Sequence, residues 1–462
     1  MTGRTAIPGY PIPRQEIQKI KFKFQTKRSW WRQGSSTFRQ GSENLLRRSE
    51  LSRAKIRNAF TVFLTLFFLL LIFNIALSSV DRPQVIALAA GWDFSLALMS
   101  DGTVFSWGFN GNGELGLGSS DYQDIHHLPK KIPYLSNIVA IAAGWNHALA
   151  LDRDGNVWAW GNNHFGQLGN GEIKDKIPFG EPVPVRVRGL SDIVAVAAGE
   201  GFSLALTRDG KLYAWGLNVN GELGVDTSKL ADWQDARAIP FPLCVEISAV
   251  KSIAAGVRHT VVLDADGSVW TFGSDSRGQL GDGRGGVYFS RNKPYKIAGL
   301  TGVKQIAAGH SMSLFLKQDG TLWAVGQFNT EAEVFSVLPT KIEGLPPVQK
   351  IYCGPSAMHV LVVDEEGKAW VWGLNTSGQL GDGSVNEIGT LLKGRGKYPP
   401  TKLDWIKKIT TAALGGSHTL VLDKDGRLWA WGNNWHCQLG IGKKSMYEPK
   451  PQEVKLVQDN SR

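Results

Sequence analysis

Residues 142–169 read AAGWNHALALDRDGNVWAWGNNHFGQLG, and the order of parts in this stretch decides the fold. A small-small-glycine triad ends at Gly144 and is followed by an apolar run, Asp154-Gly155, a tryptophan-rich segment and Gly-Gln-Leu-Gly. The last triad residue recurs at Gly91, Gly144, Gly199, Gly256, Gly309, Gly354 and Gly415, in steps of 45 to 61 residues. A mean step of 54 residues suits four short strands plus a surface loop, and it is too long for a helical solenoid unit.

Two segments of each copy predict β-strands. Segments 147–151 and 156–160 alternate along the chain, and the Asp-Gly between them offers the positive φ angles of a tight hairpin. Trp158 and Trp160 point to one face of the second strand, and the small residues beside them point to the other. Because both faces are apolar, each sheet needs a neighbouring sheet on both sides, as blades stacked in a ring provide.

The aromatic residues of the second strand form two columns through the seven copies. The outer column is Phe105, Trp158, Tyr213, Trp270, Trp323, Trp370 and Trp429, and the inner column is Trp107, Trp160, Trp215, Phe272, Val325, Trp372 and Trp431. Aromatic pairs at strand period indicate packing between sheets rather than a sugar-binding surface.

The series Ala-Ala-Gly, Asp-Gly, Trp-Gly and Gly-Gln-Leu-Gly resembles the repeat of the regulator of chromosome condensation family, over about residues 85–457. The resemblance implies an all-β fold, a seven-bladed β-propeller. Members of that family range from a nuclear exchange factor for a small GTPase to plant, bacterial and secreted binding proteins, so the fold alone names no activity. The matching motifs are structural columns, and no catalytic residue is carried over.

Local departures from the repeat carry two further predictions. Copy five lacks Gly-x-Leu-Gly after Gly326, so we expect a trimmed loop there. The segment 451–457 resembles residues 184–187, which precede the third triad. We therefore expect the C-terminal strand to pair into the blade begun by residues 85–90, closing the ring and removing an exposed edge.

An uncharged stretch at residues 58–80 precedes the repeats. Its 23 residues would span about 34 Å as a helix, enough for a hydrocarbon core of about 30 Å. We interpret it as a single transmembrane helix, a signal anchor. A cleaved signal peptide is the alternative, with Ala76-Leu-Ser78 as its site, but 57 residues precede the apolar run and the run is long for a signal core.

Charge predicts the orientation of this helix. Residues 1–57 hold 14 Lys or Arg against three Glu, whereas the rest of the chain holds 37 basic and 38 acidic residues. By the positive-inside tendency the tail stays in the cytoplasm and the propeller, residues 81–462, is extracytoplasmic. The basic, aromatic-bearing tail favours anionic lipid over nucleic acid as its partner, and a solvated, disordered tail fits its composition equally well.

We find little that points to catalysis. His147, His259, His359 and His418 share one column with Phe94, Phe202 and Met312, which indicates packing rather than a metal or catalytic site. The Asp-Gly acids fit hairpin turns. Three cysteines, Cys244, Cys353 and Cys437, lack metal or redox spacing. We therefore expect no enzyme activity, no metal and no cofactor.

The connections after Gly-x-Leu-Gly differ most between copies and are the predicted partner-binding loops. Aromatic and arginine residues on variable loops of a rigid scaffold are typical of protein-binding hot spots. The candidates are Trp233, Asp235, Arg237, Phe241, Arg284, Tyr288, Phe289, Arg291, Lys393, Arg395, Lys397 and Tyr398.

Three functions from different classes follow. The first is a membrane-anchored, non-catalytic protein-interaction module outside the cytoplasm. The second is a guanine-nucleotide exchange factor, which needs a small GTPase and a cytosolic propeller, against the charge bias. The third is an enzyme with its active site in the central channel. The sequence offers no paired acids, nucleophile-base set or metal cluster that would support it.

Overall fold

The computed structural model describes residues 61–68, 83–177, 179–227, 237–328, 335–386 and 396–456. Pro83–Arg462 form one compact unit and Met1–Arg82 another. Within Met1–Arg82 the described residues form one short helix, residues 61–68. Among the described residues, no helix combines the length and apolar character needed to cross a membrane. The rest of the predicted span 58–80, and the whole tail 1–57, lie outside the described residues.

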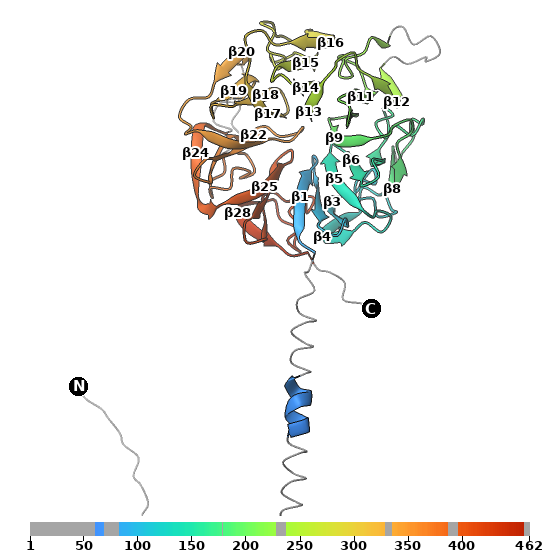
Figure 1. The fold of residues 1–462 in the computed structure, drawn as a ribbon, viewed down its shortest axis with the longest axis vertical. Helices are drawn as coiled ribbons and strands as arrows, with labels where there is room; N and C mark the ends of the chain where they lie inside the picture. Colours follow the sequence, from blue (N-terminus) through green and yellow to red (C-terminus); the bar gives the residue numbers. More distant parts are fainter. Residues whose placement is uncertain are drawn as a thin grey trace, which may run out of the picture. The chain divides into compact units, whose positions relative to one another are not determined.

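Seven four-stranded antiparallel sheets form a closed ring (Figure 1). Blades 1 to 4 contain β1 (Val85–Ala90), β2 (Phe94–Met99), β3 (Val104–Phe109), β4 (Ile125–Lys131); β5 (Ile138–Ala143), β6 (His147–Asp152), β7 (Val157–Asn162), β8 (Gly180–Arg186); β9 (Ile193–Ala198), β10 (Phe202–Thr207), β11 (Leu212–Leu217), β12 (Ala238–Cys244); and β13 (Val250–Ala255), β14 (His259–Asp264), β15 (Val269–Ser274), β16 (Ser290–Lys296).

Blades 5 to 7 follow the same order. They contain β17 (Val303–Ala308), β18 (Met312–Lys317), β19 (Leu322–Gly326), β20 (Ser336–Lys341); β21 (Val348–Tyr352), β22 (His359–Asp364), β23 (Lys368–Leu374), β24 (Gly396–Lys407); and β25 (Ile409–Leu414), β26 (His418–Asp423), β27 (Leu428–Asn433), β28 (Tyr447–Val454). The first strand of each blade lies innermost (Figure 1). The predicted all-β, seven-bladed propeller is confirmed.

Each sheet is buried on both faces, as the strand alternation predicts. In β7, Trp158 and Trp160 pack into the cluster shared with blade 1. Val157 and Ala159, on the opposite face, pack into the cluster shared with blade 3. The inner tryptophans are fully buried, so they stabilise the contacts between blades and are unavailable to a ligand.

The Asp-Gly hairpins differ in detail from the expectation. Only the glycine takes a positive φ, +81° at Gly155, while the aspartate before it does not. Gly155 N donates to Asp152 O at 3.1 Å, and Asp152 Oδ1 accepts from the N–H groups of Asp154 and Asn156. The hairpin is therefore a longer turn organised by the last residue of the second strand, with glycine supplying the one left-handed position.

The ring closes by packing rather than by the predicted strand exchange. That prediction is wrong: β28 pairs with β27, with Val454 opposite Leu428, and blade 1 consists of β1 to β4 alone. The resemblance of segment 451–457 to residues 184–187 is real, but those residues end β8, the outermost strand of blade 2. Each such segment completes its own blade, so the C-terminal one completes blade 7.

One hydrogen bond recurs at the junctions between blades. The inner tryptophan of a blade donates its Nε1–H to a carbonyl in the Gly-x-Leu-Gly loop of the preceding blade. The pairs are Trp160 to Glu114 O at 2.8 Å, Trp215 to Gln167 O at 2.9 Å, Trp431 to Gln379 O at 2.8 Å and, across the closing junction, Trp107 to Gln438 O at 2.9 Å. The closing junction is thus made like the others.

Blade 5 keeps this bond without the motif. Trp372 Nε1 donates to Phe328 O at 3.1 Å. The Phe328 side chain is buried in one cluster with Trp372, as Leu115 is with Trp160 at the junction of blades 1 and 2. The trimmed loop predicted for copy five lies at residues 329–334, outside the described residues. Phe328, the last described residue before this loop, preserves the contact that joins blades 5 and 6.

Candidate functional site

The propeller has two chemically different faces. Strand direction alternates within each blade, so the connections between first and second strands and between third and fourth strands share one face, here called the loop face. The Asp-Gly hairpins and the links from each blade to the next share the other, the hairpin face. The chain enters β1 and leaves β28 on the hairpin face. The loop face therefore carries the variable connections, while β1 begins and β28 ends on the opposite face.

The predicted partner-binding residues belong to third-to-fourth connections or to the start of the fourth strand, on the loop face. Trp233, Asp235, Lys393 and Arg395 lie outside the described residues. Arg237 and Phe241 belong to blade 3, Arg284, Tyr288, Phe289 and Arg291 to blade 4, and Lys397 and Tyr398 to blade 6. The third-to-fourth connection of blade 3 lies against the start of β16 in blade 4, because an added Cβ at Gly221 would lie 2.6 Å from Arg291 O. Blade 5 separates them from the blade 6 group.

The blade 4 connection has the clearest geometry. Asp282 is buried and accepts hydrogen bonds from Arg284 Nη2 at 2.7 Å and Arg291 Nε at 2.6 Å. Burial would raise the pKa of Asp282, but these two guanidinium hydrogen bonds outweigh it and lower the pKa to about 2. In blade 6, Lys397 forms an ion pair with Asp382 in the same way. These cations hold their own loops together.

The groups left free at the blade 4 tip are apolar and aromatic. Tyr288 is 97% exposed and Val287 is 81% exposed, while Phe289 lies 5.7 Å below the Arg284 guanidinium. A protruding aromatic on a loop braced by an Arg-Asp-Arg cluster suits insertion into a partner's pocket. Among the predicted partner-binding residues of blade 4, Tyr288 is therefore better placed than the arginines to contact a partner.

Asp275 in the same connection is an exception to a repeated asparagine. In four other blades this asparagine donates Nδ2–H to the carbonyl nine residues later: Asn110 to Ser119 at 3.0 Å, Asn163 to Glu172 at 3.0 Å, Asn375 to Ser384 at 3.1 Å and Asn434 to Lys443 at 2.9 Å. Asp275 accepts from Leu280 N at 2.9 Å, but its Oδ2 has no partner among the described residues. Burial, with the neighbouring Asp282 charge, raises the pKa of Asp275 to about 7.

We expect Asp275→Asn to stabilise the propeller by about 1 kcal/mol at pH 8, because the amide regains the repeated hydrogen bond. Because the pKa of Asp275 is higher in the folded chain than in the unfolded chain, its ionisation destabilises the fold as the pH rises from about 4 toward 7. The stability gained by Asp275→Asn is therefore larger at pH 8 than at pH 5. Urea unfolding at the two pH values measures both. Asp282→Asn, which removes the negative charge that pairs with two arginines, serves as control and is expected to destabilise. An equal gain from both variants contradicts this account.

The histidine column is structural. His147 Nε2 lies 2.9 Å from Ser203 Oγ of the next blade, and Ser203 Oγ donates to Gln167 O at 2.8 Å. Because the serine's one proton is used there, the histidine must be the donor at Nε2. The same pairing joins His259 to Ser313, His359 to Thr419 and, across the closing junction, His418 to Ser95. The predicted packing role is extended to a specific bond between blades.

Sequence reasoning missed the aromatic residues of the first-to-second connections. Trp92 and Trp145 have ring centroids 4.6 Å apart, and Trp92 N donates to Trp145 O at 3.0 Å. Beside them, His436 Nδ1 lies 3.0 Å from Asp93 Oδ2 and joins blade 7 to blade 1. The available signal was a tryptophan directly after the triad glycine in the first two copies alone.

The central cavity offers little chemistry. It measures about 300 Å³ and is lined by the innermost strands of all seven blades, mainly by alanine side chains with Tyr352 and Cys353. Burial raises the pKa of the Cys353 thiol to about 12, so this cysteine stays protonated.

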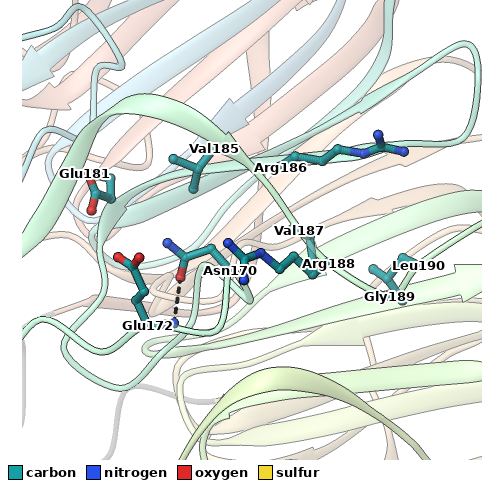
Figure 2. A pocket seen from close by; sticks show the side chains of 9 residues that line it. All are labelled: Asn170, Glu172, Glu181, Val185, Arg186, Val187, Arg188, Gly189 and Leu190. Carbon is teal, nitrogen blue, oxygen red and sulfur yellow. Dashed lines mark hydrogen bonds between the residues drawn. The ribbon is translucent and has the colours of Figure 1, made fainter.

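A larger hollow of about 670 Å³ lies at the outer edge of blade 2 (Figure 2). Figure 2 shows Glu172 and Glu181 at one end and Leu190 at the other, with Arg188 between them. An added Cβ at Gly189 would meet nothing within 4 Å, whereas blade 1 places Tyr134 at the equivalent position. Glu181, one of the two carboxylates of the hollow, already pairs with Lys174 at 2.8 Å.

Within the described ranges, no three His, Cys, Asp or Glu side chains are grouped so that they could hold a metal ion. The expectation that the protein uses no cofactor stays a prediction.

A model of the RCC1-like domain matches residues 74–334, and models of the regulator of chromosome condensation (RCC1) repeat match residues 366–422, 425–462 and 409–436. The chain belongs to the RCC1-like domain family. The predicted resemblance is therefore confirmed, and it accounts for the seven repeats of the RCC1-like propeller.

Three relatives illustrate the family. The ultraviolet-B receptor UVR8 of Arabidopsis thaliana is 28% identical over 382 residues, covering 80% of this chain and 82% of its own. The guanine nucleotide exchange factor SRM1 of Saccharomyces cerevisiae is 32% identical over 294 residues, covering 57% of this chain and 58% of its own. The crystal structure of Kap60 bound to yeast RCC1 (Prp20) holds a similar chain, with a TM-score of 0.66, 25% identity and coverage of 82% and 87%.

Proposed function

We propose that this RCC1-like propeller binds a small GTPase through its loop face and promotes guanine-nucleotide exchange. Of the two main interpretations of the sequence, the relatives favour exchange, because SRM1 bears that activity in its name and is 32% identical over 294 residues. UVR8, a similar relative, carries a different name, so membership of the family does not by itself specify the activity. The observation that carries the proposal is the protruding Tyr288 tip on a scaffold shared with an exchange factor.

Exchange suits a surface that binds without a catalytic group. A protein that binds the nucleotide-free GTPase more tightly than the loaded form must weaken nucleotide binding by the same factor. Rigid, pre-formed aromatic contacts serve this because little ordering entropy is lost on binding. The ion pairs of Asp282 with Arg284 and Arg291 provide such rigidity below Tyr288.

We expect the full chain to accelerate release of a fluorescent GDP analogue from a small GTPase of its own organism. Tyr288→Ala should reduce that acceleration about 10- to 100-fold, as the loss of a central aromatic anchor costs about 1.5 to 3 kcal/mol. Fluorescence decay after addition of excess GTP measures the rate.

Tyr134→Ala is the matched control, since Tyr134 is also an exposed tyrosine but lies in the link between β4 and β5. It should leave exchange unchanged. Equal losses from the two variants would remove the blade 4 tip from the proposal, and no acceleration with any small GTPase of the organism would reject exchange altogether.

A second candidate function is a membrane-anchored binding module outside the cytoplasm, with residues 58–80 spanning the membrane. The sequence supports it through the 23-residue uncharged stretch and the 14 basic residues against three acidic ones in residues 1–57. Here the same loop face would bind an extracytoplasmic protein, and the tail would contact anionic lipid.

Protease accessibility in sealed vesicles, with a tag at each chain end, separates the two functions. A propeller reached only from the cytosolic side supports exchange on a GTPase. A propeller reached from outside, with the basic tail protected, supports the extracytoplasmic module and excludes exchange.

A further inference from the structure

The innermost strand of every blade carries a β-bulge next to the hairpin face. In β1 the pairing register skips between Val85 and Ala87, so Ile86 is the extra residue. The same skip recurs in all seven blades and leaves one unpaired residue in each, namely Ile86, Val139, Val194, Lys251, Lys304, Gln349 and Thr410. The fold thus builds a ring of bulged residues around the hairpin-face mouth of the channel.

This ring is chemically lopsided. Ile86, Val139 and Val194 are 50%, 44% and 40% exposed, and they sit on three consecutive blades whose innermost strands contact one another. We call these three residues the apolar arc. The next two bulged residues are lysines, Lys251 and Lys304. A run of exposed aliphatic side chains continued by lysines is the composition of a surface that meets a lipid headgroup layer.

The acidic residues of the same face are neutralised on four blades, whereas the hairpin carboxylates Asp101 of blade 1, Asp154 of blade 2 and Asp319 of blade 5 form no ion pair among the described residues. The hairpin carboxylates of blades 3, 4, 6 and 7 are paired with cations: Asp209 with Lys211, Asp266 with Lys296, Glu366 with Lys368 and Asp425 with Arg427. The lysines of the bulge ring are not among these partners, so their charges remain available to anionic headgroups.

A membrane span at residues 58–80 would bring a bilayer close to this face. Only four residues separate Val80, the end of the uncharged stretch, from Val85, the start of β1. Even fully extended, that link spans at most about 18 Å. If residues 58–80 cross a bilayer, as the second candidate function holds, the hairpin-face mouth lies beside the headgroups.

We propose that the apolar arc, with Lys251 and Lys304, rests in the headgroup layer of an anionic phospholipid bilayer and turns the loop face toward the aqueous side. The inference rests on the membrane span proposed above, and not on the identity of the partner. It gives the propeller a fixed orientation, in which Tyr288 and the other loop-face groups point away from the lipid.

The test uses the full chain in vesicles of phosphatidylcholine and phosphatidylserine. Native cysteines are replaced by residues that other copies carry or tolerate, Cys244→Ser, Cys353→Ala and Cys437→Gly. A fluorescent probe is then attached through Val194→Cys or Val219→Cys. Both valines are exposed, at 40% and 54%, and both belong to blade 3, but Val219 lies on the loop face. Lipids carrying a shallow quencher should quench the probe at 194 at least threefold more than at 219.

Proximity alone is separated from insertion by a second variant. With the probe at Val139→Cys, the changes Ile86→Gln and Val194→Gln should remove most of the quenching while the melting curve stays unchanged. Equal quenching at 194 and 219, or quenching indifferent to the glutamines, overturns the proposal. If the probe becomes buried as the protein concentration increases, and not when lipid is added, the proposal is also overturned. The apolar arc would then be a contact with a second copy of the chain.

Flotation after a carbonate wash reports the membrane span by itself. If the chains float but the probes at 194 and 219 are quenched equally, the membrane span is supported and the contact of the apolar arc with lipid is refuted. Chains that fail to float refute the anchor, and selective quenching at 194 by phosphatidylserine vesicles would then support the lipid-binding arc alone.

Discussion

Acidification from pH 7.5 to pH 5 is expected to destabilise the propeller by about 2 kcal/mol for each of His147, His259, His359 and His418. All four are buried and neutral, with Nε2 bonded to a hydroxyl of the next blade. Burial lowers the pKa of the first three to about 3 and that of His418 to about 4.

The direction follows from linkage. The unfolded chain takes up a proton at each histidine below about pH 6.5, and the folded chain does not until near pH 3 to 4. The stability is therefore complete above pH 6.5 and is lost as the pH falls, at about 1.4 kcal/mol per pH unit per histidine.

Two buried glutamates act in the opposite direction. Burial raises the pKa of Glu114 and Glu222 to about 7, against hydrogen bonds from Asn112 and Asn220 that lower it. Their folded forms hold protons that the unfolded chain releases above about pH 4.5, so this part of the stability increases as the pH falls from 7. The histidine contribution must therefore be isolated with variants.

The chain supplies the variant. At the junction of blades 1 and 2, Phe94 stands in the histidine column and Ala148 in the hydroxyl column. His147→Phe combined with Ser203→Ala copies that pair, and we expect it to lose about 2 kcal/mol less than the unmodified chain between pH 7.5 and 5. Ser203→Ala alone should cost about 1 kcal/mol at both pH values. An unchanged pH dependence in the double variant would contradict the assignment.

Trp107→Ala is expected to cost 3 to 5 kcal/mol of unfolding free energy, about the loss from emptying any buried tryptophan site. Trp107 is fully buried between blades 7 and 1, and its Nε1–H donates to Gln438 O at 2.9 Å. Because β28 does not pair into blade 1, this packing closes the ring together with side-chain bonds such as His418 to Ser95 and His436 to Asp93. Urea unfolding followed by circular dichroism measures the loss.

Trp160→Ala, at the junction of blades 1 and 2, is the matched comparison, with the equivalent bond to Glu114 O at 2.8 Å. Losses equal within about 1 kcal/mol support a closing junction built like the others. A far smaller loss at Trp107 would show that closure depends on something else. Trp107→Phe, the aromatic that blade 4 carries at Phe272, should cost less than the alanine variant at the same site.

Much of the fold is readable from the sequence because its signals are local. Each signal extends over about ten residues: a strand period, an Asp-Gly turn or a triad glycine. Each is weak in one copy, but its repetition in seven copies predicts the fold strongly. The predicted faces of Trp158 and Trp160 are confirmed for that reason. The candidate site is less readable from the sequence. Arg284 and Arg291 were predicted as partner contacts, but Asp282 engages both. The available signal was an aspartate directly after Gly-Gln-Leu-Gly, which copy six repeats at Asp382.

What the sequence by itself determined is the number of blades, the two central strands of each blade with the hairpin between them, and the residues of the core, since these depend on period and polarity along the chain. What only the tertiary structure decided are the contacts between blades: β28 completing its own blade, each histidine meeting a hydroxyl more than 50 residues away or at the other end of the chain, and the bulged residues of seven strands gathering into one ring. Such contacts join positions whose separation in sequence carries no periodic signal, so packing alone brings them together.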